Sequence, residues 1–252
     1  MSCYQDEAFI LKATPLKEAD QILTLLSAQY GQYQVMAYGI AKLNSKRRGA
    51  LQPFNYSKLL LRRGSKWDSV EQGEAISCFA ELKESLEGLA CLSYLAELAS
   101  RTEREAAPAV LSLLLRSLAF WGQGESWQLL RSFESQLLVL SGIFPHLENC
   151  LNCGLLSSQY YFSYKQGGLL CPACSQKQPD SFLIGLDTRQ ILKLLRDWSL
   201  EQLVRLKVDS RQKKLVEQLL WRFMQYHWDL SLKSRSFLTW LEADKNLPEG
   251  NY

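Results

Sequence analysis

The sequence lacks the features that several protein classes require. Its 252 residues include only two histidines, His146 and His227, and they are far apart. No P-loop, dinucleotide-binding glycine pattern or nucleophile elbow is present, so we predict no enzyme and assign no catalytic residue. No apolar run approaches the roughly 20 residues of a membrane span, and "MSCYQDEAF" lacks the basic and apolar regions of a secretory signal. These absences predict a cytosolic protein with no membrane association.

The seven cysteines do not form the paired framework of a secreted protein. Cys3, Cys78 and Cys91 have no partner at a regular spacing, and the total is odd. The remaining four form two Cys-x-x-Cys pairs separated by seventeen residues: Cys150, Cys153, Cys171 and Cys174. Two such turns that face each other supply the four thiolates that zinc prefers, whereas a thioredoxin-like redox site uses a single pair.

We therefore predict a structural Zn²⁺ in a zinc ribbon. Between the two pairs, "YYFSY" followed by Gly167 and Gly168 is typical of a β-hairpin. His146, just upstream, is an alternative ligand. With all four positions taken by sulfur, no site remains for a water molecule, which argues against a hydrolytic zinc centre.

Acidic residues are missing from one long window near the start of the chain. No Asp or Glu lies between Asp20 and Asp68, yet eight Lys or Arg residues do. From 68 to 150, by contrast, twelve acidic residues face five basic ones. Such segregation predicts a polyanionic partner, although a basic run taken alone is more often a solvated face. The candidate phosphate-binding residues are Lys46, Arg47 and Arg48, extended by Arg62 and Arg63.

The spacing of apolar residues predicts an α+β protein. Five short strands are expected within residues 1–78, which suits a small β-barrel of the OB type, with an SH3-like barrel nearly as suitable. In such a barrel the basic stretch lies beside a nucleic-acid-binding groove, and exposed aromatic residues would stack bases. The candidate aromatics are Tyr30, Tyr33, Tyr38, Phe54 and Tyr56.

Residues 79–252 are expected to form an α-helical domain with a zinc-binding insertion at about 147–178. "AVLSLLLRSLAF" is apolar on most sides and predicts a buried central helix. We expect Asp187 and Gln190 to form a capping box, and Gly142 to end the helix before the insertion. Ser210 is expected to cap the final helix, which would turn Leu215, Leu219 and Phe223 inward.

Four segments together resemble the family of the bacterial DNA repair protein RecO, recombination protein O. They are "AFILKATPLKEADQILTLLSAQYG", "AKLNSKRRGALQPF", the four-cysteine segment and "LKSRSFL" at 232–238. The resemblance implies an N-terminal OB-fold, a zinc-binding helical domain, binding of single- and double-stranded DNA, and strand annealing. It also implies partnership with RecR and help in loading the recombinase RecA onto DNA coated by single-strand-binding protein.

The resemblance extends to individual positions. Lys42, Lys46, Arg47 and Arg48 match the family's basic DNA-contacting loop, and Cys150, Cys153, Cys171 and Cys174 match its zinc ligands. Leu43 and Asn44 dilute the basic run that many relatives carry, which predicts weaker DNA binding by this loop. The alternative is a zinc-ribbon module of transcription that binds protein or RNA, which would have no reason to anneal DNA strands.

Overall fold

The computed structural model describes the chain except residues 1, 17, 43, 102, 229–230 and 245–252. It contains two compact units. The barrel unit comprises residues 1–119 and 232–252, and the cysteine unit comprises residues 120–231. The expected boundary between residues 78 and 79 coincides with the change from strands to helices. The division into domains 1–78 and 79–252 stays a prediction.

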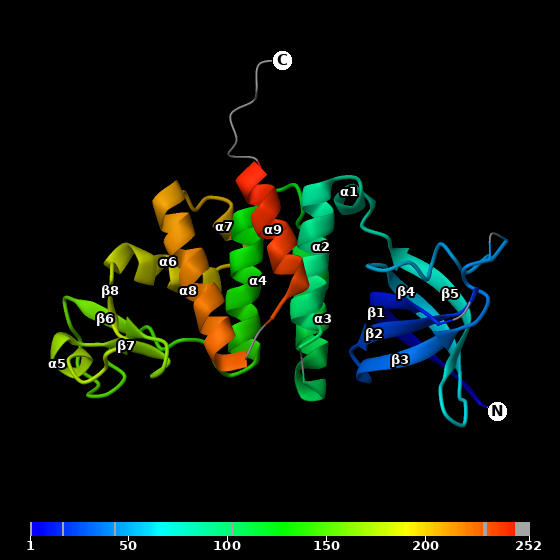
Figure 1. Ribbon diagram of the computed structural model, residues 1–252, viewed down its shortest axis with the longest axis horizontal. Coiled ribbons are helices and arrows are strands. Elements are labelled where there is room, and N and C mark those ends of the chain that lie inside the picture. Colours follow the sequence, from blue (N-terminus) through cyan, green and yellow to red (C-terminus); the bar gives the residue numbers. More distant parts are fainter. Residues whose placement is uncertain (1, 17, 43, 102, 229–230, 245–252) are drawn as a thin grey trace, which may run out of the picture. The chain divides into compact units, whose positions relative to one another are not determined.

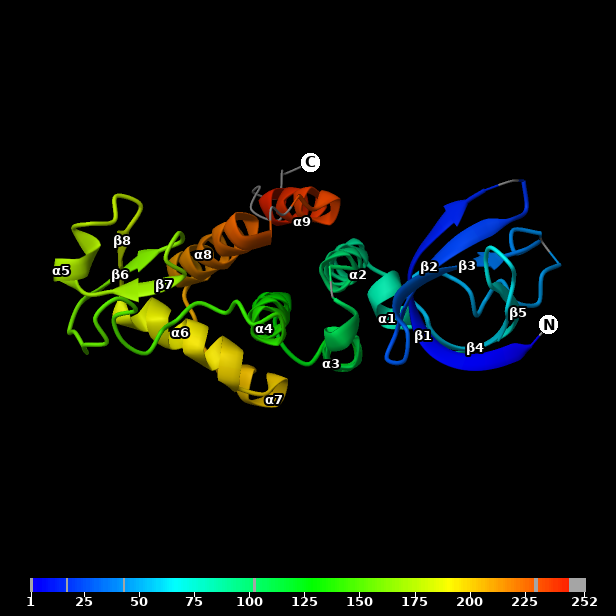
Figure 2. The same ribbon diagram turned by 90° about the horizontal axis from the view of Figure 1, so that it is seen from below.

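The first five strands close into a barrel, which Figure 2 shows as a ring of strands. They are β1 (Cys3–Pro15), β2 (Gln21–Ser27), β3 (Gly31–Ala37), β4 (Tyr56–Arg62) and β5 (Ser69–Ser77). Their order around the barrel is β1-β2-β3-β5-β4. The long strand β1 pairs with both β2 and β4, and an irregularity in its pairing with β2 falls between Ile10 and Lys12. The barrel closes where Met36 of β3 pairs in parallel with Ser69 of β5.

The barrel core follows the period-two pattern of its strands. Ala8 and Ile10 of β1, with Leu23 and Leu25 of β2, point inward and are fully buried. Alternate side chains of a strand lie on opposite faces of the sheet, so this spacing buries one face of each strand. The five expected strands are confirmed, and Tyr33, a candidate base-stacking aromatic, packs against the core.

Helices complete the barrel unit. They are α1 (Ala80–Lys83), α2 (Leu86–Ala99), the short 3-10 helix η1 (Arg104–Ala106), α3 (Ala107–Ala119) and α9 (Lys233–Asp244). The apolar helix expected at residues 109–120 is confirmed as α3, which buries seven of its residues and exposes Ala109, Ser112 and Arg116 along one side. The helix α2 is the more deeply buried of the two, with nine of its residues inside.

The helix α9 returns to the barrel unit from the far end of the chain and lies beside α2 (Figure 1). Glu97 of α2 holds its first turn. The carboxylate accepts hydrogen bonds from the backbone N–H of Lys233 (3.2 Å) and from the N–H (3.0 Å) and hydroxyl (2.6 Å) of Ser234. A negative charge satisfies the free N–H groups at a helix N-terminus and complements the helix dipole. The segment "LKSRSFL" therefore begins a helix.

The cysteine unit combines helices with a small sheet. Its elements are α4 (Ser126–Leu140), β6 (Tyr160–Ser163), β7 (Gly168–Leu170), α5 (Pro172–Ser175), β8 (Phe182–Ile184), α6 (Leu186–Asp197), α7 (Leu200–Leu203) and α8 (Ser210–Trp228). The strand order is β7-β6-β8. Gly142 has φ +71° just after α4, which confirms it as a helix stop.

The expectations for the later helices are met only in part. Gly185 precedes α6 without a side-chain cap, so Asp187 lies inside the first turn and forms no capping box. Asp209, one residue before the expected cap Ser210, accepts from the N–H groups of Arg211 and Gln212 at the start of α8. Leu219 and Phe223 of α8 are buried as expected, but Leu215 is 44% exposed, and α8 is followed by α9. Among the described residues, no helix combines the length and the apolar character needed to span a membrane.

Candidate metal centre and nucleic-acid interface

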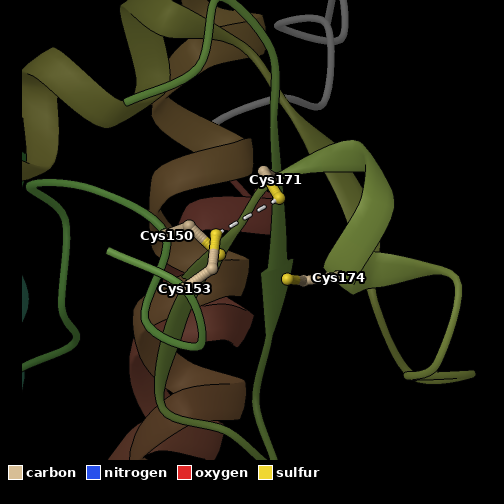
Figure 3. Close-up of side chains that lie close together, drawn as sticks. All are labelled: Cys150, Cys153, Cys171 and Cys174. Carbon is tan, nitrogen blue, oxygen red and sulfur yellow. Dashed lines mark hydrogen bonds between the residues drawn. The ribbon is translucent and has the colours of Figure 1, made fainter. Parts of the chain in front are cut away.

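The four cysteines of the cysteine unit converge on one point. Cys150 and Cys153 come from the loop before β6, whereas Cys171 and Cys174 lie at and within the short helix α5 (Figure 3). All four sulfur atoms lie within 4.8 Å of one another. The Sγ atoms of Cys153 and Cys171 are 3.8 Å apart. Zinc–sulfur bonds of about 2.3 Å in a tetrahedron place sulfur atoms about 3.8 Å apart, so this donor set fits zinc.

The backbone of each Cys-x-x-Cys turn is locally determined. Gly154 has φ +73° and donates its N–H to the carbonyl of Cys150 (2.8 Å), which closes the first turn. Glycine adopts this conformation without the steric cost that a Cβ would bring. In the second turn, Pro172 occupies the first position of α5, where its missing N–H costs no hydrogen bond. The two turns are joined by the β6–β7 hairpin, which confirms the expected hairpin.

The thiols of the cluster differ in their pKa values. Burial disfavours a charged Cys150, but hydrogen bonds from the backbone N–H groups of Cys171, Cys153 and Asn152 lower the pKa of its thiol to about 6. The hydrogen bonds from Leu155 and Asn152 are outweighed by the neighbouring thiols and burial, which raise the pKa of Cys153 to about 11 and also raise the pKa of Cys174. The Nδ2 of Asn152 also lies 3.4 Å from the sulfur of Cys174. Four thiolates this close repel one another unless a positive ion lies between them.

His146 is placed outside this cluster. Its Nε2 lies 2.6 Å from Oδ1 of Asn149, and the metal-ligand group contains only the four cysteines among the residues described. Its backbone pairs with the end of the hairpin, because its N–H donates to Gly167 and its carbonyl accepts from Leu169. A Cβ at Gly168 would meet the His146 carbonyl oxygen at 2.6 Å, so the close approach requires glycine there.

Helix α6 anchors the cysteine hairpin. Arg189 donates to the carbonyl oxygens of Leu147 and Glu148, both at 2.7 Å, and its guanidinium lies 4.8 Å from the centre of the Tyr160 ring. Lys193 pairs with the Glu148 carboxylate at 2.5 Å. On the other side, Phe162 packs edge-on against Phe223 of α8. The segment that carries the cysteines therefore packs on two helices of its own unit.

The basic residues expected to contact nucleic acid lie in the connection between β3 and β4, at the end of β4 and in the β4–β5 turn. Lys42, Lys46, Arg48, Arg62 and Arg63 are exposed, and Arg47 is partly buried. A surface hollow of about 540 Å³ opens beside the connection. Its lining residues are Asp20, Tyr38, Gly39, Lys42, Asn44, Ser45, Lys46 and Arg47.

Arg47 differs from its neighbours because its guanidinium is engaged by the barrel. Nη2 donates to the carbonyl of Tyr38 at 2.8 Å, and Nη1 donates to the carbonyls of Val70 and Glu71 on β5. Charged donors that bind backbone carbonyls form the stronger class of hydrogen bonds. Arg47 thus ties the basic connection to the barrel wall.

Asn55 secures the other end of the connection. It is 1% exposed, and its Nδ2 donates to the carbonyl of Gly49 at 2.8 Å, while its Oδ1 accepts from Nζ of Lys83 at 2.5 Å. Burial lowers the pKa of the Lys83 ammonium. Neither residue was among the expected site residues. The position of Asn55 directly before a strand was the available signal, since Asn side chains commonly bind nearby backbone groups in turns.

The two arginines of the β4–β5 side also have partners in the barrel. Arg62 forms a salt bridge with Glu71 at 2.5 Å. The guanidinium of Arg63 lies 4.9 Å from the centre of the Tyr4 ring. Each keeps an exposed side chain, but a bound phosphate would compete with these contacts. This makes the exposed residues of the β3–β4 connection the freer cations.

The candidate aromatics divide according to their hydroxyl partners. Tyr33 donates to Asp6 at 2.6 Å, and Tyr56 donates to Glu7 at 2.9 Å. Burial raises the pKa of the Tyr56 hydroxyl to about 12, with its hydrogen bond to Glu7 adding to the effect. Tyr30 and Phe54 are partly buried, and Tyr38 is 52% exposed. Trp67 of the β4–β5 turn, absent from the expected set, is 37% exposed.

The fold and the two sites define a class of protein: a small closed barrel with a basic surface connection, joined to helices and a four-cysteine centre fit for a metal ion. The family models are more specific. Residues 1–79 match "Recombination protein O N terminal", and residues 83–236 match "Recombination protein O C terminal". The chain belongs to the RecO family, as its sequence motifs predicted.

Curated relatives agree along nearly the whole length. The DNA repair protein RecO of Pelotomaculum thermopropionicum is 37% identical over 94% of each chain. That of Desulforamulus reducens is 36% identical, again over 94% of each chain. The DNA repair protein RecO of Bacillus subtilis is 28% identical over 96% of each chain.

Proposed function

We propose that this chain acts in DNA repair by binding DNA and annealing complementary strands. In this proposal it helps to load the recombinase RecA onto single-stranded DNA coated by single-strand-binding protein, with RecR as a partner. It works by binding, without an active site, in the cytosol. The barrel is of the OB type, and the four-cysteine hairpin is a zinc ribbon.

The observation that supports this proposal most directly is the basic connection of the barrel. Lys42, Lys46 and Arg48 are exposed on a segment whose ends are held by Arg47 and Asn55. Two DNA strands repel because both are polyanions, and cations held on a fixed surface lower that repulsion without reading the bases. The names of the relatives, DNA repair proteins, support the same process.

We assign the zinc a structural role. Its four thiolate ligands leave no position for water, and the hairpin that carries them packs on α6 and α8 through Arg189 and Phe162. Catalysis would require an open coordination position. We infer that Zn²⁺ stabilises the cysteine unit and that DNA contacts lie on the barrel.

Strand annealing tests the proposal. Two complementary oligonucleotides labelled with a fluorophore and a quencher are mixed with the purified full-length chain, and the rate of quenching is measured. We expect annealing to accelerate and the effect to fade as salt rises, because bound phosphates release counterions that compete at high salt. A triple Lys42→Gln, Lys46→Gln, Arg48→Gln variant should lose most of the acceleration.

The control replaces three exposed lysines or arginines elsewhere: Lys177→Gln, Arg205→Gln and Lys207→Gln in the cysteine unit. This variant should anneal strands at the rate of the unmodified chain. Binding to RNA with no annealing of DNA would instead favour the transcription module. Equal loss in the two triple variants would mean that net charge, and not the barrel connection, controls the activity.

A further inference from the structure

The hollow beside the basic connection combines an exposed aromatic ring with cations. Tyr38 directly follows β3, is 52% exposed, and lines the hollow together with Lys42 and Lys46. The hydroxyl groups of Tyr33 and Tyr56 donate hydrogen bonds to Asp6 and Glu7, but no described side chain binds the hydroxyl of Tyr38. An aromatic face open to solvent beside phosphate-binding cations is the arrangement on which single-stranded nucleic acid stacks its bases.

The backbone that carries Tyr38 is held from both sides. Its carbonyl accepts from Arg47 at 2.8 Å, and the N–H of the next residue, Gly39, donates to the Asp20 carboxylate at 2.8 Å. Gly39 adopts φ +66°, a conformation that glycine tolerates. The β1–β2 turn adds a further tie, because Ala41 donates its N–H to the carbonyl of Ala19. A ring on such a support loses little additional freedom when a base stacks on it.

Charge around the hollow favours a nucleotide over an uncharged aromatic ligand. Asp20 is the one acidic residue among the described lining residues, and part of its charge is offset by the Gly39 N–H. Lys42 and Lys46 are exposed on the same lining. The hollow, at about 540 Å³, lies within the range of roughly 300 to 1,000 Å³ that small-ligand sites occupy.

We propose that Tyr38 is a base-stacking residue and that the hollow takes one unstacked nucleotide of a single strand, with its phosphate at Lys42 and Lys46. This inference rests on the proposed function and adds strand preference to it. In a duplex the base faces are covered by neighbouring bases, so they cannot reach a ring at the protein surface without unpairing. The barrel therefore binds single strands more tightly than duplexes.

The test compares three probes of equal length by fluorescence anisotropy at fixed salt: oligo-dT, an abasic strand with the same phosphates, and a duplex. Tyr38→Ala should weaken binding to oligo-dT about 5- to 150-fold, the range expected from losing one base–aromatic stack. Tyr38→Phe keeps the ring and should bind like the unmodified chain. Neither variant should change binding to the abasic strand or the duplex.

Tyr226→Ala is the matched control, because Tyr226 is 55% exposed and lies on α8 of the cysteine unit. It should bind all three probes unchanged. If Tyr38→Ala binds oligo-dT normally, or weakens the abasic strand equally, Tyr38 does not stack bases and this inference is overturned. If the unmodified chain ignores all three probes even at low salt, the proposed function itself fails.

Discussion

Arg47 and Arg48 are adjacent and carry the same charge, yet the structure predicts different consequences when each is replaced. The Arg48 side chain is exposed, and none of the described residues pairs with its guanidinium. Arg48→Gln should therefore remove one phosphate contact. The slope of log binding constant against log salt should flatten by about 0.7 for a single strand, with stability unchanged.

Arg47→Gln should instead lower the stability of the chain and leave the salt dependence of binding unchanged. Its guanidinium donates to the carbonyls of Tyr38, Val70 and Glu71, so its charge already has acceptors within the barrel. Hydrogen bonds from a charged group contribute about 1.5 to 3 kcal/mol each, and partial exposure places the net loss near the value for one such bond. In a chain of this size that loss lowers Tm by roughly 3 to 12 °C.

Two measurements separate the two roles: oligo-dT affinity between 50 and 300 mM salt, and thermal unfolding followed by circular dichroism. Arg116→Gln serves as the control, since Arg116 is exposed on α3 and should alter neither quantity. The reasoning is refuted if Arg47→Gln flattens the salt slope as much as Arg48→Gln while Tm stays unchanged. That result would mean that Arg47 leaves its carbonyl partners to bind phosphate.

Three further predictions concern the rest of the chain. Cys171→Ser should abolish stoichiometric zinc binding and destabilise the cysteine unit by several kcal/mol, and an affinity for oligo-dT that falls in the still-folded variant would contradict a purely structural zinc. Glu97→Ala should cost about 1 to 2 kcal/mol and speed hydrogen exchange in α9, whereas Ser234→Ala, which leaves both backbone contacts of Glu97 intact, should cost less. The pair with Lys193 lowers the pKa of Glu148, so its contribution is present above the unfolded pKa of a Glu and disappears as pH falls through the lowered folded value. Glu148→Gln should thus destabilise the chain by at most about 1 kcal/mol at pH 7, because the pair is partly exposed, and by progressively less as the pH falls through the lowered folded pKa of Glu148; a loss that does not change with pH would point to packing.

The strands and the cluster of four cysteines could be predicted from the sequence because their signals are local. Alternation over a few residues buries one face of β2 or β3, and Cys-x-x-Cys spacing presents two sulfurs from one turn. The hairpin between the two turns brings the sulfurs together within 4.8 Å. The window without acidic residues is likewise visible from the sequence, because it requires only a count of Asp and Glu. The sequence motifs also predicted the family that the family models match.

Helix caps and the roles of individual cations needed the tertiary structure. The sequence put the caps at Asp187 and Ser210, but the backbone begins its helices after Gly185 and Asp209. Helix boundaries shift by a residue or two when packing selects among neighbouring polar groups, so spacing alone does not place them.

The amino-acid sequence by itself determined what this chain carries: five strands, four clustered cysteines and a stretch of unopposed positive charge. Tertiary structure decided which charges remain available, because Arg47 meets Val70 from 23 positions away and Glu97 holds Ser234 from 137 positions away. Such contacts depend on how distant segments pack, and no local pattern encodes them. Composition sets the net attraction for a polyanion, and the folded backbone selects the side chains that are free to bind it.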